Sequence, residues 1–348
     1  MIMDKIIEYL KNNWQRTAII AGAVLIVLSA GSVAVLSMAR SRQFNHQPAV
    51  SNSNNNAPVS VSAATVRTYA DLYAVSIDNH VDARPVSGIN QAVIVYETPV
   101  EGDITRFLAF FERGTTVAQI GPVRSARLYL LDWVTQLGAA AFFHFGGSPE
   151  AMAQLATNVS LGAINNDGAG AAGNLFWRDA GRQAPHNAYT SSGNADKFFA
   201  ARVGSANVTS GWLMAPDPDL SARGADGQKV AAPLSSTAAY SPVWIYDQMQ
   251  NVYRRTVKGQ VEKDAAGAAI TAKNIIAIST DVSVIDNDGR LKIATSGKGA
   301  ARIYRNGTQQ DVTWEKSDAG ATPVRFYAAD GSEAVLTAGS VWLEVVRK

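Results

Sequence analysis

The chain has 348 residues, of which 47% are hydrophobic and 17% charged, with a net charge of +2 and no cysteine. This length predicts two domains, and the proportions of hydrophobic and charged residues are those of a folded protein rather than a disordered one. The near-neutral charge, without a local basic stripe, argues against nucleic-acid binding. The lack of cysteine excludes disulfides, thiolate metal sites, a cysteine nucleophile and a lipid-modified cysteine.

Residues 17–39 form an uncharged apolar run that is long enough to cross a membrane as a helix. A cleaved signal peptide has a shorter apolar region, although the small residues around Ala39 also allow cleavage. Three basic residues precede the run and two follow it, which favours a cytoplasmic N-terminus. We therefore predict a short cytoplasmic segment (1–16), a single-pass plasma-membrane anchor (17–39) and soluble extracytoplasmic domains.

Residues 40–66 are rich in Asn and Ser and predict a flexible tether. Between residues 67 and 201, strand-like apolar runs alternate with helical patterns, which is typical of an α/β (α+β) domain. Strands are predicted at 72–77, 92–97, 106–111 and 139–145, and helices with Ser125 and Ser148 as N-caps. The second helix start has Pro149 and Glu150 in its first turn, both favoured there.

The chain after residue 156 is less regular. Residues 157–179 are rich in Gly, Ala and Asn and are predicted to be mainly loop. Residues 202–236 are rich in small residues, Pro and Asp, and we place the domain junction there. From residue 237 to 348, short apolar runs alternate with turns such as Asn306-Gly307, which predicts a mostly β second domain, a small barrel or sandwich.

Four ordered motifs resemble those of a known family: SIDNHVDARPVSGINQ from Ser76, IGPVRSAR from Ile120, FHFGGSPEA from Phe143 and FWRDAGRQAPHNAYTS from Phe176. They are similar to the YerB-like family of bacterial envelope lipoproteins, a domain family of unknown function. The C-terminal GSVWLEVV resembles the family's second domain. The resemblance spans residues 72–348 and implies an extracytoplasmic, membrane-tethered protein, but no reaction.

The chain departs from this family in two places. Many members are tethered through a lipidated cysteine, which is absent here, so the apolar helix would take over that role. Members also often carry a His before an Asp near the start of the second domain, where this chain has Glu262 before Asp264. A function that depends on that His is therefore not implied for this chain.

Arg124 and Arg127 flank Ser125 at a predicted helix start, where cations oppose the helix dipole. One interpretation is a bound phosphate, sulfate or carboxylate, since arginine offers a planar fork and the helix end offers free N–H groups. The other is an internal ion pair with Glu97, Glu101 or Asp103. The same carboxylates could act as an acid–base pair on a glycan, although structural pairing is the more ordinary use of such groups.

Three histidines lie in or near the family motifs. His144 stands in an apolar strand, which is typical of a satisfied core side chain, whereas His186 and Asn187 follow Pro185 in a loop. Together with His80 they suggest an acid–base or metal site, but their spacing matches no metal motif, and we predict neither a metal nor a cofactor.

Two further features have a structural and a functional interpretation. Gly146-Gly147-Ser148 precedes a helix and could bind an anion through backbone N–H groups, but a plain strand-to-helix turn explains it equally simply. The aromatic residues of the second domain could stack on sugars, although β-domains also bury such residues. They are Tyr246, Tyr253, Tyr304, Trp314 and Trp342.

We therefore predict an envelope protein that binds an anionic or glycan-like ligand in its α/β domain, with a cell-wall polymer or an envelope protein as partner. The alternatives are a cell-wall polymer hydrolase and a non-catalytic scaffold. The candidate ligand-binding residues are Asp78, Asn79, Arg84, Arg124, Arg127, Ser148, His186 and Asn187. The candidate acid–base residues are Glu97, Glu101, His144 and His186.

Overall fold

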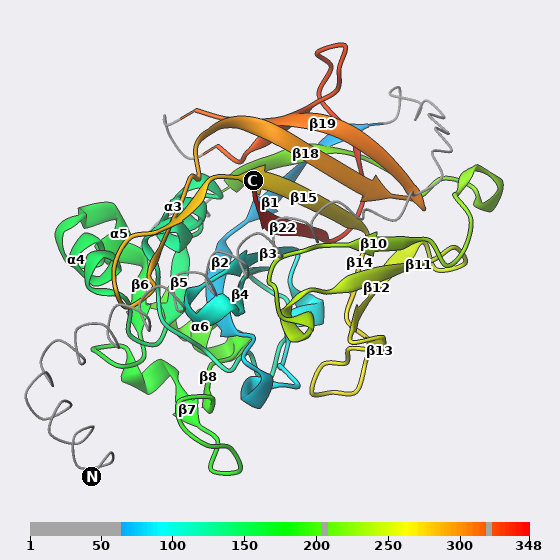
Figure 1. The fold of residues 1–348 in the computed structure, drawn as a ribbon. Helices are drawn as coiled ribbons and strands as arrows, with labels where there is room; N and C mark the ends of the chain where they lie inside the picture. The colour runs from blue at the N-terminus through cyan, green and yellow to red at the C-terminus, as the bar shows by residue number, and fades with distance from the viewer. Residues whose placement is uncertain (1–63, 203–207, 318–321) are drawn as a thin grey trace, which may run out of the picture. The chain divides into compact units, whose positions relative to one another are not determined.

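The computed structural model describes residues 64–202, 208–317 and 322–348, and the predicted anchor lies outside these ranges. Within them, no helix has the length and apolar character needed to cross a membrane. The described chain is mostly β, and its α-helices all lie between residues 128 and 200 (Figure 1). They are α3 (Leu128–Gln136), α4 (Pro149–Thr157), α5 (Val159–Ile164) and α6 (Ser192–Ala200).

A ten-stranded mixed sheet forms the centre of the described structure. In spatial order its strands are β20 (Arg325–Tyr327), β19 (Thr308–Lys316), β18 (Gly297–Arg305), β15 (Asn274–Thr280), β22 (Val341–Arg347), β3 (Ile94–Pro99), β4 (Thr105–Glu112), β2 (Leu72–Asp78), β5 (Ala141–His144) and β6 (Asn165–Asp167). The C-terminal strand β22 lies parallel to β15 on one side and to β3 on the other. The first and second halves of the chain therefore share one sheet.

The remaining strands form smaller sheets and hairpins. One sheet holds β1 (Thr65–Ala70), β9 (Val208–Ala215) and β21 (Leu336–Thr337). A second holds β10 (Lys229–Ala231), β11 (Val243–Asp247), β12 (Val252–Val257), β13 (Gln260–Val261) and β14 (Thr271–Ala272). The pairs are β7 (Trp177–Arg178) with β8 (Ala188–Tyr189), and β16 (Val282–Val284) with β17 (Leu291–Ile293).

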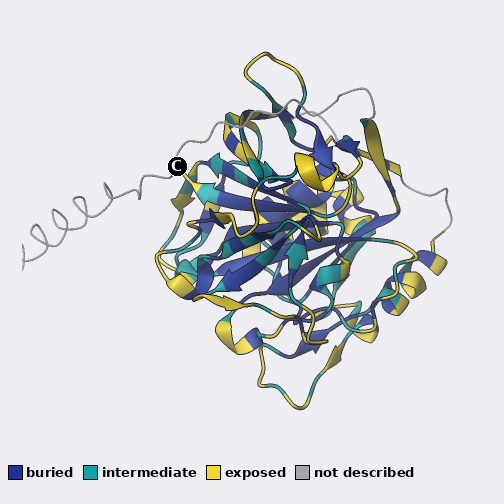
Figure 2. Ribbon diagram, turned by 90° about the vertical axis from the view of Figure 1, so that its right-hand side faces the viewer, coloured by how far each residue is buried: buried dark blue, intermediate teal, exposed yellow. Residues whose placement is uncertain are grey.

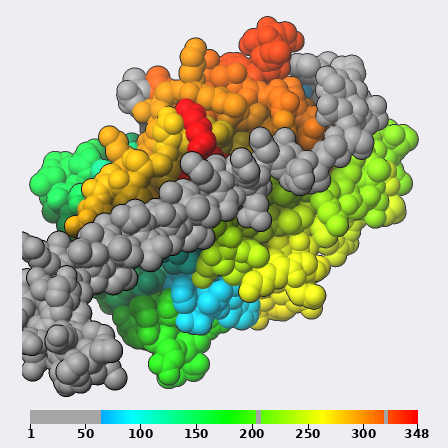
Figure 3. Space-filling view, in the orientation of Figure 1, coloured from blue at the N-terminus to red at the C-terminus, as the bar shows by residue number. Residues whose placement is uncertain are grey.

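Both faces of the central sheet are covered, which is why β2, β3 and β4 are almost continuously buried (Figure 2). One face packs against α3, α4 and β9 around Tyr96 and Trp133. The other packs against α6 and the β10–β14 sheet around Phe107 and Trp342. The gold β16–β17 hairpin of the second half lies beside the green α4–α5 segment (Figure 3), where Arg290 pairs with Glu150.

Several predicted elements are confirmed. Strands β2 and β4 cover the predicted runs 72–77 and 106–111, and strands β3 and β5 overlap the predicted runs 92–97 and 139–145. Helix α4 begins at Pro149, and the Ser148 hydroxyl accepts a hydrogen bond from the Ala151 N–H, as the capping pattern predicted. Of the second-domain aromatics, Tyr246, Tyr253, Trp314 and Trp342 are buried, as expected for core residues.

The predicted N-cap at Ser125 is wrong by two residues. Helix α3 begins at Leu128, and its N-cap is Arg127, whose side chain makes no capping hydrogen bond. The preceding backbone is extended because it pairs with two other segments. The Arg124 N–H donates to the Ser76 carbonyl, and Ala126 exchanges hydrogen bonds with the 146–148 turn.

Two other expectations need correction. Residues 157–179 are not mainly loop, since they hold helix α5 and strand β6. Asn158 caps α5, and β6 pairs with β5 and so completes the edge of the sheet. The second half does not form a self-contained barrel or sandwich, because it shares the central sheet with the first half, and its β10–β14 sheet packs against that shared sheet. Five of its strands extend the sheet that the first half begins, and this continuation buries their apolar side chains without a second closed barrel.

Candidate functional site

Asp78, the last residue of β2, is the centre of one polar cluster. Its Oδ2 lies 2.7 Å from His186 Nδ1 and 3.0 Å from Arg124 Nε, and its Oδ1 accepts the His80 N–H at 3.0 Å. The His80 and His186 rings stack with centroids 4.7 Å apart. Asp78 itself is buried, whereas the side chains of His186, Arg124 and His80 are 15%, 25% and 32% exposed. The cluster therefore has a buried carboxylate behind three groups that reach the surface.

The loop that carries His186 is held against the β2 end by Arg182. The Arg182 guanidinium donates to the carbonyls of Ala83 and Pro85 at 2.7 and 2.8 Å. Asn187 closes the same loop, with its Nδ2 donating to the Asp179 and Arg182 carbonyls. These hydrogen bonds give Asn187 a structural role, which is to hold the loop that positions His186.

Asn79 and Glu97 belong to a closed buried network. The Glu97 carboxylate accepts from Asn79, Thr105 and Arg255, and Arg255 Nη2 lies 2.8 Å from both of its oxygens. Both Glu97 and Arg255 have fully buried side chains. Because Arg255 is on β12, this ion pair ties the two halves of the chain together. Such a carboxylate is not available as an acid or base at the surface.

Arg84 and Glu262 lie at the outer side of that network. Arg255 Nη1 contacts Glu262, and Arg84 donates from Nε to the Asn79 side chain and lies 3.5 Å from a Glu262 oxygen. Burial, together with the neighbouring charge of Arg255, lowers the pKa of Arg84 to about 10. Glu262, which stands where members of the resembled family often have a His, therefore supplies a carboxylate to both Arg84 and Arg255.

Glu344 is a buried acid outside the predicted site residues. It lies on β22 opposite Glu97 of β3, and Trp244 Nε1 donates to its Oε1 at 2.7 Å. Burial raises the pKa of Glu344 well above its usual value, and the adjacent Glu97 charge raises it further. Both effects favour the protonated form of this carboxyl. The signal in the sequence was a single acid within the apolar run VWLEVV.

Arg106, at the start of β4, is a buried cation with few partners among the described residues. It is 3% exposed, its Nη1 donates to the Ser125 carbonyl at 2.9 Å, and its Nε is buried without a hydrogen bond. Among the described residues it forms no ion pair with a carboxylate. Burial lowers the pKa of Arg106 to about 10, and the nearby Arg127 and Arg124 lower it as well, whereas Tyr129 and Asp78 act in the opposite direction.

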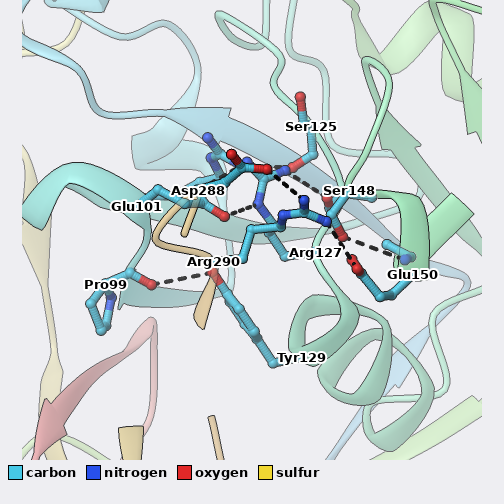
Figure 4. Close-up of polar contacts among 12 residues, drawn as sticks. Pro99, Glu101, Ser125, Arg127, Tyr129, Ser148, Glu150, Asp288 and Arg290 are labelled. Carbon is cyan, nitrogen blue, oxygen red and sulfur yellow. Dashed lines mark hydrogen bonds and ion pairs between the residues drawn. The ribbon is translucent and has the colours of Figure 1, made fainter. Parts of the chain in front are cut away.

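Arg127 and Glu101 form a two-pronged ion pair, with Nε and Nη2 at 2.6 and 2.9 Å from the two carboxylate oxygens (Figure 4). Burial alone would raise the pKa of Glu101, but the hydrogen bonds and charge of Arg127 outweigh it, and the pKa is lowered. Glu101 therefore stays ionised. Arg127 therefore forms the internal ion pair that was the alternative prediction to a bound ligand.

A cavity of about 310 Å³ lies beside Arg127, between the first turns of α3 and α4 and the β16–β17 hairpin. Its lining includes Arg127, Tyr129, Ser148, Ile285, Arg290 and Lys292. Arg290 already pairs with Glu150, Asp286 and Asp288, so its charge is matched within the protein. A larger cavity of about 400 Å³, near Asp167 and Lys197, contains none of the predicted site residues.

His144 is a core residue. Its side chain is fully buried, with Nδ1 2.8 Å from the Gly146 carbonyl and Nε2 2.7 Å from Asn165 Oδ1. Both ring nitrogens are therefore occupied by structural contacts, and the ring stacks on Phe142.

The predicted residues thus divide into separate groups. Asp78, Arg124 and His186 come together at the end of β2, and Arg127, Glu101 and Ser148 lie at or near the cavity of about 310 Å³. Asn79, Arg84 and Glu97 join the buried network, and His144 stands alone in the core. Among the described residues, His80, Asp82 and His186 are the group of ligand-type side chains whose atoms could hold a metal ion.

Two family models of unknown function match the chain: the DUF3048 N-terminal domain at residues 60–206 and the DUF3048 C-terminal domain at residues 230–343. Over 277 residues the chain is 30% identical to the "Putative lipoprotein YerB" of Bacillus subtilis (strain 168), covering 78% of this chain and 80% of that protein. The crystal structure of the YerB protein from Bacillus subtilis matches with a TM-score of 0.65 and 27% identity. That match covers 80% of this chain and 91% of the solved one.

Proposed function

We propose that this chain, which belongs to the DUF3048 family, is an extracytoplasmic protein of the bacterial envelope that binds an anionic ligand beside Arg106 and Arg124. One observation carries the proposal: the buried Arg106 guanidinium forms no ion pair with a carboxylate among the described residues, although Asp78 lies opposite it across the β2–β4 pair. A buried charge is costly unless an opposite charge accompanies it. A bound anion would supply that charge.

The charge balance around Arg106 supports the same ligand class. The cluster contains three guanidinium groups, on Arg106, Arg124 and Arg127, against two carboxylates, on Asp78 and Glu101. The Arg124 ion pair uses Nε, which leaves its terminal nitrogens for a ligand. Guanidinium groups bind phosphate, sulfate and carboxylate through two parallel hydrogen bonds. A group of this kind on an envelope polymer fits the cluster.

Binding is favoured over hydrolysis because the acids are already paired. Glu97 is closed in with Arg255, and Glu101 is held by both prongs of Arg127. Glycan hydrolysis by the usual route needs two carboxyl groups that reach the scissile bond. The cavity beside Arg127 has the size of a small ligand site and would receive the sugar part of a charged glycan.

The membrane association of the chain is part of the proposal. Residues 17–39 are uncharged and long enough to span the hydrocarbon core, and the chain has no cysteine that could carry a lipid. The similar protein from Bacillus subtilis is named as a putative lipoprotein. Treating intact cells with protease should degrade residues 64–348, and alkaline carbonate should leave the uncut chain in the membrane. Carbonate extraction of the intact chain would contradict the anchor.

Ligand binding can be tested with the full-length chain in detergent and purified anionic cell-wall polymer. Arg106→Met and Arg124→Ala should each lower retention on the polymer by about tenfold, the equivalent of one lost charge-assisted contact. The matched control is Arg302→Ala, since Arg302 is an exposed arginine paired with Asp311. Equal retention of all three variants and the wild type would reject the site, and the scaffold alternative would then gain support.

A further inference from the structure

We propose that His80, Asp82 and His186 bind a divalent transition-metal ion such as Zn²⁺. Their ligand atoms all lie within 4.8 Å of one another, at the surface end of the Asp78 cluster. Two imidazoles and one carboxylate are a common ligand set for Zn²⁺ and Fe²⁺ sites that keep open positions for water or substrate. The inference does not depend on anion binding by Arg106.

His186 has the hydrogen-bonding partner that a metal-ligating histidine usually has. Its Nδ1 lies 2.7 Å from Asp78 Oδ2, and a carboxylate can only accept a hydrogen bond, so Nδ1 carries the proton. The lone pair of the neutral ring is therefore on Nε2. Metal-ligating histidines are usually held in this way by a carboxylate on the other nitrogen. Asp78 is buried and is itself fixed by Arg124 and the His80 N–H.

His80 and Asp82 are spaced as two ligands of one ion. His80 Nδ1 lies 3.4 Å from Asp82 Oδ2. Ligand atoms at about 2.0–2.1 Å from a tetrahedral ion are about 3.3–3.4 Å apart. The same Nδ1 accepts the Asp82 N–H at 3.2 Å, which shows that its lone pair faces this side and makes a long contact that an ion would replace.

The elements that carry the ligands are held together without a metal. His80 and Asp82 lie on a short turn of 3₁₀ helix (Val81–Ala83) after β2, and His186 lies on a loop more than 100 residues later. Arg182 clamps that loop to the carbonyls of Ala83 and Pro85, and the two imidazole rings stack. Because a metal lies in the plane of each imidazole that binds it, the nearly parallel His80 and His186 rings must turn relative to each other when an ion binds. That movement, and the one of the 70% exposed Asp82, is confined to side chains.

The test uses the tag-free full-length chain, stripped with a chelator and titrated with Zn²⁺ and, for its visible absorption, with Co²⁺. One equivalent should bind, and His80→Gln or His186→Gln should weaken binding by about tenfold or more. Because its side chain is exposed, Asp82→Asn leaves the packing intact and should weaken binding even if a His variant fails to fold. His46→Gln, outside the described residues, is the matched control and should bind like the wild type.

Asp78→Asn separates a supporting role from a ligand role. Asp78 holds His186 through Nδ1 and takes no ligand position, so this variant should keep the one-to-one stoichiometry and lose about 10–100-fold in affinity. The absence of saturable Zn²⁺ binding to the wild type would overturn the proposal. Equal affinities for the wild type and Asp82→Asn would overturn it as well.

Discussion

Glu97 and Glu344 lie opposite each other on the parallel strands β3 and β22, and both side chains are fully buried. Arg255 donates to both oxygens of Glu97, while Trp244 donates to one oxygen of Glu344. Two buried carboxyls so placed cannot both ionise cheaply, and burial and the adjacent Glu97 charge raise the pKa of Glu344, which favours its protonated form. The contact joins a strand of the first half to a strand of the second, so its protonation state bears on how the two halves hold together.

Replacement of Glu344 by Gln should make the protein less sensitive to alkaline pH. The folded-state pKa of Glu344 lies above its unfolded value, so the stability that its proton provides is present at low pH and is lost as pH rises through the folded pKa. Glutamine keeps the neutral shape at every pH. Urea unfolding at pH 5, 7 and 9 should therefore show a growing advantage for Glu344→Gln.

The control for this series is Glu315→Gln on an exposed position of β19. That variant should follow the wild-type pH curve. If Glu344→Gln and the wild type lose stability in parallel from pH 5 to 9, the protonated state assigned to Glu344 is incorrect.

Arg255→Met should destabilise the protein by about 3–5 kcal/mol, because it leaves Glu97 as a buried, unpaired carboxylate. Adding Glu97→Gln to Arg255→Met removes that charge and should recover part of the loss. Arg302→Met, at an exposed pair with Asp311, should cost about 0–1 kcal/mol. The urea midpoints of the wild type, the two single variants and the double variant test this prediction. A double variant that is less stable than Arg255→Met would contradict it.

The sequence was sufficient where the determining signals are local. The central strands were predicted because continuous apolar runs of β-branched and aromatic residues read as strands buried on both faces. Helix α4 was predicted from Ser148, Pro149 and Glu150, which act within one turn. The resemblance to the YerB-like family is confirmed by both DUF3048 models. The anchor at 17–39 lies outside the described residues and stays a prediction.

The site was less predictable because its contacts join distant segments. Glu97 and Arg255 are 158 positions apart, and Asp78 and His186 are 108 apart. Nothing near Glu97 in the sequence indicates that β12 brings a guanidinium to it. Ser125 was misread as a helix cap because the same residue type also suits the extended segment that pairs with the 146–148 turn.

Replacement of Glu101 by Gln should destabilise the protein more at neutral pH than at acidic pH. Burial raises the pKa of Glu101 and Arg127 lowers it by more, so the net shift is downward. The stability from this pair is present above the unfolded pKa and is lost as pH falls through the folded pKa. Glu101→Gln should lower the free energy of unfolding by about 1 kcal/mol at pH 7 and by less at pH 3. The value is small because solvent screens this partly exposed pair. An equal cost at both pH values would contradict the pair's contribution.

Arg106→Met should make the ligand-free protein at least as stable as the wild type, although it removes a hydrogen bond to Ser125. The reason is that a buried cation without a carboxylate partner is costly, whereas methionine fills a similar volume without charge. Thermal unfolding in phosphate-free buffer tests the first part. Added inorganic phosphate should then raise the wild-type melting temperature and leave Arg106→Met unchanged, because the anion stabilises only a fold that binds it. Strong destabilisation by Arg106→Met in phosphate-free buffer would show instead that the guanidinium is a structural group satisfied within the fold.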